Sequence, residues 1–179
     1  MSTLPISTPV AVAAVAALVA AAGDLRGFRI RNALTLPLLA AGLLYGGLHG
    51  GWAGLGAALL GACFGLGILL SPYAAGAMGG GDVKLMAGVG AWLGLPLAFE
   101  VLLAAAIASG LYAAAVAVAT GRVAETYDRV VRLMATGKIA PGDRVAATLA
   151  GPERRRRLVP FAAMVALGLG VAAIRGAAG

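Results

Sequence analysis

Three of the seven acidic residues in this chain of 179 residues lie at or inside long apolar runs. They are Asp24, which ends the first apolar run, Asp82, which follows three consecutive glycines, and Glu100. An ionisable side chain is costly in an apolar segment and is therefore a functional candidate by default. The other four acidic residues belong to a polar stretch where charge is expected: Glu125, Asp128, Asp143 and Glu153.

Asp24 and Asp82 could together hydrolyse a peptide bond. Two carboxylates that lie close together cannot both ionise at low cost, so one keeps its proton while the other acts as a base. The ionised partner takes a proton from water, the neutral partner donates one to the scissile carbonyl, and no acyl-enzyme forms. Spacing alone leaves an equal alternative open, in which each carboxylate pairs with a nearby cation as a topological anchor: Arg26, Arg29 or Lys84.

The glycines Gly79, Gly80 and Gly81 directly precede Asp82. Glycine allows backbone conformations closed to other residues and lets another backbone approach without a side chain in between. A substrate peptide has to be extended to be cut, and unpaired backbone at membrane depth persists only where protein or water satisfies it. A pliable glycine loop that carries a catalytic acid suits this need. A phosphate-binding loop is disfavoured, because the sequence contains no G-x-x-x-x-G-K-[ST] pattern.

The composition indicates a membrane protein, because 61% of the residues are hydrophobic and only 12% are charged. We expect an all-α, polytopic membrane helical bundle of about six transmembrane helices. The expected spans cover about residues 8–23, 34–49, 52–71, 84–95, 97–120 and 158–174, with joints at His49-Gly50-Gly51 and Leu95-Pro96 among others. A cleaved signal peptide is the alternative for the first span, but MSTLPISTPV lacks the positive charge of such peptides.

The positive charges predict the orientation of this bundle. Thirteen of the fourteen Lys and Arg residues fall on one side of the expected spans, and only Arg175 falls on the other. Because such residues concentrate in cytoplasmic loops, that side is the cytoplasm and the N-terminus lies outside. Asp24 and Asp82 then share one membrane depth at the cytoplasmic surface, and Glu100 lies near the opposite face. This distribution favours membrane topology over nucleic-acid binding as the reason for the net charge of +7.

Residues 121–157 form the one sizeable polar region, and we expect them to be a cytoplasmic amphipathic connector within a single membrane-embedded domain, 1–179. Apolar residues recur there at helical spacing with charges around them, which favours a basic helix on the inner leaflet: Val123, Tyr127, Val130 and Met134. The chain has one cysteine and no cluster with metal-ligand spacing, so we expect no metal site.

Two separated motifs resemble those of the prepilin peptidases, the type IV leader peptidase family of membrane aspartic proteases with a Gly-x-Gly-Asp motif. The segment GGGDVKL, residues 79–85, matches the second-aspartate motif of that family. The segment DLRGFRIRN, residues 24–32, resembles the first-aspartate motif, although Arg31 stands where proline is usual. Towards the end, the segment from Val159 to Gly168 resembles the closing helix of the family.

The resemblance implies a reaction and a set of site residues. The reaction is endoproteolysis of prepilin-like proteins, which carry a short basic leader before a hydrophobic helix, at the cytoplasmic face of the bacterial inner membrane. The cleaved proteins then assemble into pili or secretion pseudopili. No cofactor is implied, because an aspartic pair needs only water. The implied residues are Asp24 and Asp82 as the catalytic pair, Gly79, Gly80, Gly81 and Lys84 as the active-site loop, and Arg26, Ile30 and Asn32 as supports of the first motif.

Larger members of that family carry a cytoplasmic domain with paired cysteines and also N-methylate the new terminus. The chain shows neither feature and resembles the short enzymes of the tight-adherence (Flp) pilus systems. We therefore expect a peptidase without N-methyltransferase activity.

Two alternatives to this interpretation remain open at the level of sequence. The first is a non-enzymatic membrane transporter or assembly scaffold that uses Asp24 and Asp82 for ion pairing or proton relay. The second is a different intramembrane aspartic protease, such as a relative of signal peptide peptidase or presenilin, in which the acids lie deeper and in late helices. The position of Asp24 after the first span fits the prepilin peptidases better.

Overall fold

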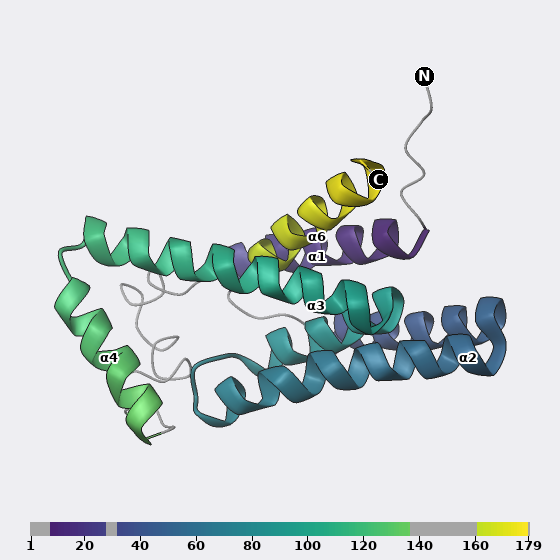
Figure 1. Ribbon diagram of the computed structural model, residues 1–179, viewed down its shortest axis with the longest axis horizontal. Coiled ribbons are helices and arrows are strands. Elements are labelled where there is room, and N and C mark those ends of the chain that lie inside the picture. Colours follow the sequence, from purple (N-terminus) through teal and green to yellow (C-terminus); the bar gives the residue numbers. More distant parts are fainter. Residues whose placement is uncertain (1–7, 28–31, 137–160, 179) are drawn as a thin grey trace.

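The computed structural model describes residues 8–27, 32–136 and 161–178, and these ranges contain helices and short connections but no strand. The all-α prediction is therefore confirmed for the described part of the chain. Figure 1 shows the helices in their arrangement: α1 (Thr8–Gly27), α2 (Asn32–Ala74), α3 (Gly80–Ala119), α4 (Val123–Thr136) and α6 (Phe161–Ala178).

The two long helices, α2 and α3, each contain a sharp kink at a glycine. Gly51 has φ 57° and Gly94 has φ 70°, and residues other than glycine rarely adopt these positive values. The two halves of α2 fold back on each other at the Gly51 kink. The close approach of the Gly46 and Gly54 backbones shows this. The kinks lie in or next to the expected joints at His49-Gly50-Gly51 and Leu95-Pro96, so glycine and proline marked both changes of direction correctly.

The first segment of α3 is enclosed by both halves of α2. The second half of α2 approaches it backbone to backbone, with Gly61 against Gly90 and Gly65 against Met86. The first half of α2 lies on another side, where the Trp92 indole Nε1 donates a hydrogen bond to the Leu38 carbonyl oxygen at 2.9 Å. Small residues allow this close approach, which is how helices associate where hydrophobic burial gives little driving force.

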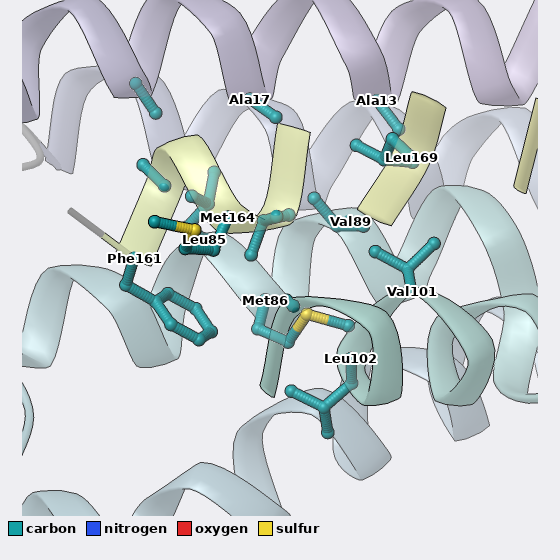
Figure 2. Packing of buried hydrophobic residues seen from close by; sticks show 14 of the residues in the cluster. Ala13, Ala17, Leu85, Met86, Val89, Val101, Leu102, Phe161, Met164 and Leu169 are labelled. Carbon is teal, nitrogen blue, oxygen red and sulfur yellow. The ribbon is translucent and has the colours of Figure 1, made fainter. Parts of the chain in front are cut away.

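Helices α1 and α6 complete the core on a further side of α3 (Figure 2). The buried face of α1 consists of alanines at helical spacing, among them Ala13, Ala17 and Ala20. The larger buried side chains come from α3 and α6: Leu85, Met86, Val89, Val101, Val165 and Leu169. The small alanine face of α1 thus packs against the bulky side chains of α3 and α6, and this lets α1 approach α3 closely.

The outer surface of the bundle is apolar. Large hydrophobic side chains point away from the core along α2 and α3, and Leu48 and Trp52 are 81% and 89% exposed. Both long helices are long and apolar enough to cross a membrane, while the apolar stretches of α1 and α6 are shorter. An apolar surface this extended is typical of contact with lipid or with another protein.

The glycine contact between α2 and α3 can be tested by filling it. A Cβ atom on Gly61 would collide with the backbone of Gly90, whereas a Cβ on Gly67 of the same helix meets nothing within 4 Å. We predict that Gly61→Ala lowers the free energy of unfolding by about 1–3 kcal/mol, as overpacking does. Gly67→Ala should raise it by up to about 1 kcal/mol, because alanine favours a helix more than glycine does and its methyl group meets no neighbour. Thermal unfolding in detergent compares the two variants, and equal midpoints would contradict the packing.

Candidate active site

Asp82 lies in the first turn of α3, where the backbone of a glycine three residues earlier holds its carboxylate. Gly79 is the N-cap of the helix, and its N–H donates a hydrogen bond to Asp82 Oδ2 at 3.3 Å. In return the Asp82 N–H donates to the Gly79 carbonyl oxygen at 3.2 Å. This contact is the side-chain half of a capping box, and the helix dipole favours a negative charge at this end. Asp82 is therefore partly fixed before any substrate arrives.

The flexible glycine loop is shorter than expected. The fourth expected span began at about residue 84, but α3 begins at Gly80, so Gly80 and Gly81 are helical. The helix begins directly after Gly79, whose backbone is extended and is tied to Asp82 by two hydrogen bonds, Gly79 N–H to Asp82 Oδ2 and Asp82 N–H to the Gly79 carbonyl oxygen. Only Ala75 to Gly79 connect the two helices outside helical structure.

The end of α2 turns the chain back towards this site through a glycine cap. Gly76 has φ 83°, its N–H donates to the Tyr73 carbonyl oxygen, and the Ala77 N–H donates to the Pro72 carbonyl oxygen, both at 2.9 Å. This pair of hydrogen bonds is a Schellman motif, which ends a helix and reverses the chain. The motif brings Gly80 back onto the side chain of Tyr73.

The Tyr73 ring lies against the backbone of Gly80. A Cβ atom on Gly80 would be 3.3 Å from Tyr73 Cε2, so only glycine leaves the ring its full room. Sequence reasoning missed this residue. The signal was present in part, because a glycine three residues after Tyr73 marks a helix end, but the contact with Gly80 requires the turn to be known.

Lys84 and Asn32 connect the two motif segments. Lys84 Nζ donates a hydrogen bond to Asn32 Oδ1 at 3.0 Å, between two side chains that are 52 residues apart in sequence. Asn32 begins α2, and Lys84 lies half a turn after Asp82 in α3. The bond thus holds the start of α2 beside the helix turn that carries Asp82.

Asp24 belongs to the last turn of α1, which extends beyond the expected end at about residue 23 to Gly27. Ile30 lies outside the described residues, and so do the side chains of Asp24 and Arg26. The pairing of Asp24 with Asp82 therefore remains a prediction. Glu100 is exposed and follows the kink of α3, on a different segment from Asp82.

The described residues contain no group of three or more His, Cys, Asp or Glu side chains that could hold a metal ion. What the described residues place here is the Asp82 carboxylate in the first turn of α3, held by the Gly79 N–H.

Comparison with known proteins decides the family. Residues 11–114, more than half of the chain, match the type IV leader peptidase family. The chain belongs to this family. The matched residues include both Asp24 and Asp82, and the resemblance inferred from the two motifs is confirmed.

Curated relatives in the type IV leader peptidase family are named prepilin leader peptidase/N-methyltransferase. The protein from Aeromonas salmonicida is 41% identical over 96 residues, which are 50% of this chain and 33% of the relative. The protein from Neisseria gonorrhoeae is 42% identical over 99 residues, 51% of this chain and 34% of the relative. The chain thus spans about a third of the length of these relatives. No solved structure matches the chain.

The bond between Lys84 and Asn32 predicts a measurable coupling. Lys84→Met and Asn32→Leu should each destabilise the protein slightly, and the double variant should lose less than the sum. We expect a coupling free energy of about 0.5–1 kcal/mol, because both side chains are exposed and water competes for the bond. Unfolding of the four proteins in detergent gives this value. Asn32→Asp keeps the acceptor oxygen and serves as the control, and strict additivity would contradict the contact.

Proposed function

We propose that this protein is a membrane aspartic endopeptidase that removes the leader from prepilin-like proteins, with Asp24 and Asp82 as its catalytic pair. Membership of the type IV leader peptidase family supports a peptidase role. The printed name of the curated relatives, prepilin leader peptidase/N-methyltransferase, supports a prepilin as substrate. The positions of Asp24 and Asp82 at the ends of their helices support the aspartic mechanism.

One observation carries the proposed pair, namely the register of two facing helix stripes. On α3, Asp82 precedes the buried residues Leu85 and Val89 at helical spacing. On α1, Asp24 follows the buried alanines Ala17 and Ala20 in the same way. These buried residues belong to one core (Figure 2). Residues that extend the two stripes at the same end of the bundle are expected to meet there.

The helix ends assign the roles within the pair. A negative charge on Asp82 is favoured by the N-terminus of α3 and by the Gly79 N–H, so Asp82 is the base. Asp24 lies in the last turn of α1, where the helix dipole disfavours a negative charge, so Asp24 carries the proton. This division of labour needs no metal ion.

The proposed reaction then balances over two steps. Asp82 takes a proton from water as the water oxygen attacks the scissile carbonyl carbon, and Asp24 gives its proton to the carbonyl oxygen. In the second step Asp24 takes back a proton from the tetrahedral intermediate, the carbon–nitrogen bond breaks, and Asp82 protonates the leaving amine. The pair is thereby restored to its starting state.

The helical segments support a six-span topology for this enzyme. Division of α2 at Gly51 and of α3 at Gly94 gives four apolar segments in addition to α1 and α6. We propose that each crosses the bacterial inner membrane, with the N-terminus outside and the site at the cytoplasmic face. Helix α4 would lie on the inner leaflet, since its apolar residues Val123, Tyr127 and Met134 are exposed.

The proposed substrate is a prepilin of the tight-adherence (Flp) type, with a basic leader before a hydrophobic helix. We propose leader cleavage alone, without N-methylation of the new terminus. The mass of the mature pilin shows whether a methyl group is added.

The central test is leader removal by the wild type and by Asp24→Asn and Asp82→Asn. Asparagine keeps an acceptor oxygen for the Gly79 N–H, so Asp82→Asn should fold normally while it loses the ionisable group. We predict that each variant lowers the cleavage rate by about a hundredfold to ten-thousandfold, the usual contribution of a general acid or base. Co-expression with a Flp-type prepilin and separation of the cleaved form by electrophoresis measure this at matched membrane levels.

Asp128→Asn, a change of the same type in α4, is the control and should cleave normally. Cleavage by all variants would favour the transporter or scaffold, in which the two acids serve ion pairing or proton relay.

The topology predicts which engineered thiols face the outside. In a Cys63→Ala background, His49→Cys near the kink of α2 should react with a membrane-impermeant maleimide in intact spheroplasts. Asp128→Cys in α4 should react only after lysis. Both positions are exposed in the structure, so the membrane alone decides access. The opposite pattern would invert the orientation, and labelling of both positions would contradict a sealed six-span arrangement.

A further inference from the structure

We propose that Tyr73 is a positioning residue of the active site, whose ring holds the first turn of α3 and thereby the Asp82 carboxylate. The inference rests on the proposed peptidase function and deepens it. It starts from the contact of the ring with Gly80, two residues before Asp82, where a Cβ atom would be 3.3 Å from Tyr73 Cε2.

The turn that carries Asp82 is weak by itself. Its cap and its first two helical residues are all glycines, Gly79 to Gly81, and glycine is a poor helix former with a large loss of backbone freedom on ordering. The N-cap glycine offers no side-chain oxygen to the free N–H groups of the helix end. A turn of this kind frays unless another part of the structure holds it.

Tyr73 has one contact at each end of the connection between α2 and α3. Its carbonyl oxygen accepts the Gly76 N–H in the cap of α2, which fixes the connection between the helices. Its ring covers Gly80 on the far side of that connection. Any residue at position 73 would keep the backbone bond, so a side-chain substitution removes the ring contact alone.

The ring is not part of the core of the bundle. Tyr73 is 48% exposed and is not a member of the cluster of buried residues to which α1, α2, α3 and α6 contribute. Loss of the ring should therefore leave the thermal unfolding midpoint nearly unchanged while the Asp82 turn loosens. A misplacement of about 1 Å at a reacting group can lower a rate about a hundredfold, so activity is the more sensitive quantity.

The test compares Tyr73→Leu, which removes the ring, with Tyr73→Phe, which keeps the ring and removes only the hydroxyl. We expect Tyr73→Leu to lower kcat about tenfold to a hundredfold with little change in KM, and Tyr73→Phe to stay near the wild type. Tyr127→Leu in α4, a tyrosine that is 68% exposed, is the matched control and should cleave normally.

Gly80→Ala provides a second, independent variant. In the wild-type background its methyl group should push against the ring and lower the cleavage rate. In the Tyr73→Leu background the same change should raise the rate, because alanine strengthens the helix and no ring stands in its way. A reversal of sign between the two backgrounds is specific to the ring contact, and a simple loss of stability does not produce it.

Hydrogen exchange of the peptide that covers residues 79–85, in lipid nanodiscs, gives a readout that does not depend on cleavage. Exchange should be faster in Tyr73→Leu than in the wild type and unchanged in Tyr73→Phe. If the wild type never cleaves a prepilin, the peptidase proposal is wrong. The exchange result still tests whether the Tyr73 ring holds the first turn of α3. If the wild type cleaves and Tyr73→Leu matches it in rate and exchange, or if Tyr73→Phe is impaired equally, the ring contact has no positioning role.

Discussion

The close approach of α2 and α3 at Gly61 and Gly90 determines much of this structure. With no side chain between the two backbones, the first segment of α3 fits against both halves of α2 and still presents its bulky residues to α1 and α6. The helix that carries Asp82 is thus held on several sides by short-range packing. A larger residue at this contact would separate the helices and move every group that α3 carries.

The candidate active site lies where this rigid packing ends. After Asp82, α3 is buried from Val83 to Ala91 except for Lys84. The cap and the first two helical residues before Asp82 are glycines. The Asp82 carboxylate therefore lies in a first helical turn that is less well packed than the rest of the helix. The contacts of this first turn include the Gly79 N–H to Asp82, the Tyr73 ring on Gly80 and the Lys84 bond to Asn32. These contacts limit how far the first turn of α3 can move.

The sequence correctly predicted helices throughout the described residues, and it singled out the candidate residues whose pairing stays a prediction. Charged residues are rare in so apolar a chain, so Asp24 and Asp82 stood out. The breaker residues placed one joint at the kink of Gly51 and the other at Leu95-Pro96, one residue after the kink of Gly94. The start of α3 at Gly80 was not predicted, because a run of glycines normally indicates a loop and the cap by Asp82 is a matter of side-chain geometry. The partners Tyr73 and Asn32 were beyond reach as contacts, since both depend on the register between separate helices.

The proposed mechanism requires that Asp24 and Asp82 meet at one end of the bundle. The most direct measurement is thiol cross-linking of Asp24→Cys with Asp82→Cys in membranes, in a Cys63→Ala background that removes the only native cysteine. We predict rapid cross-linking of Asp24→Cys with Asp82→Cys by a short bifunctional thiol reagent, and none between Asp24→Cys and Glu100→Cys. If the Asp24 and Asp82 positions fail to cross-link while each thiol reacts singly with the reagent, the two acids do not form a pair and the proposed mechanism is wrong.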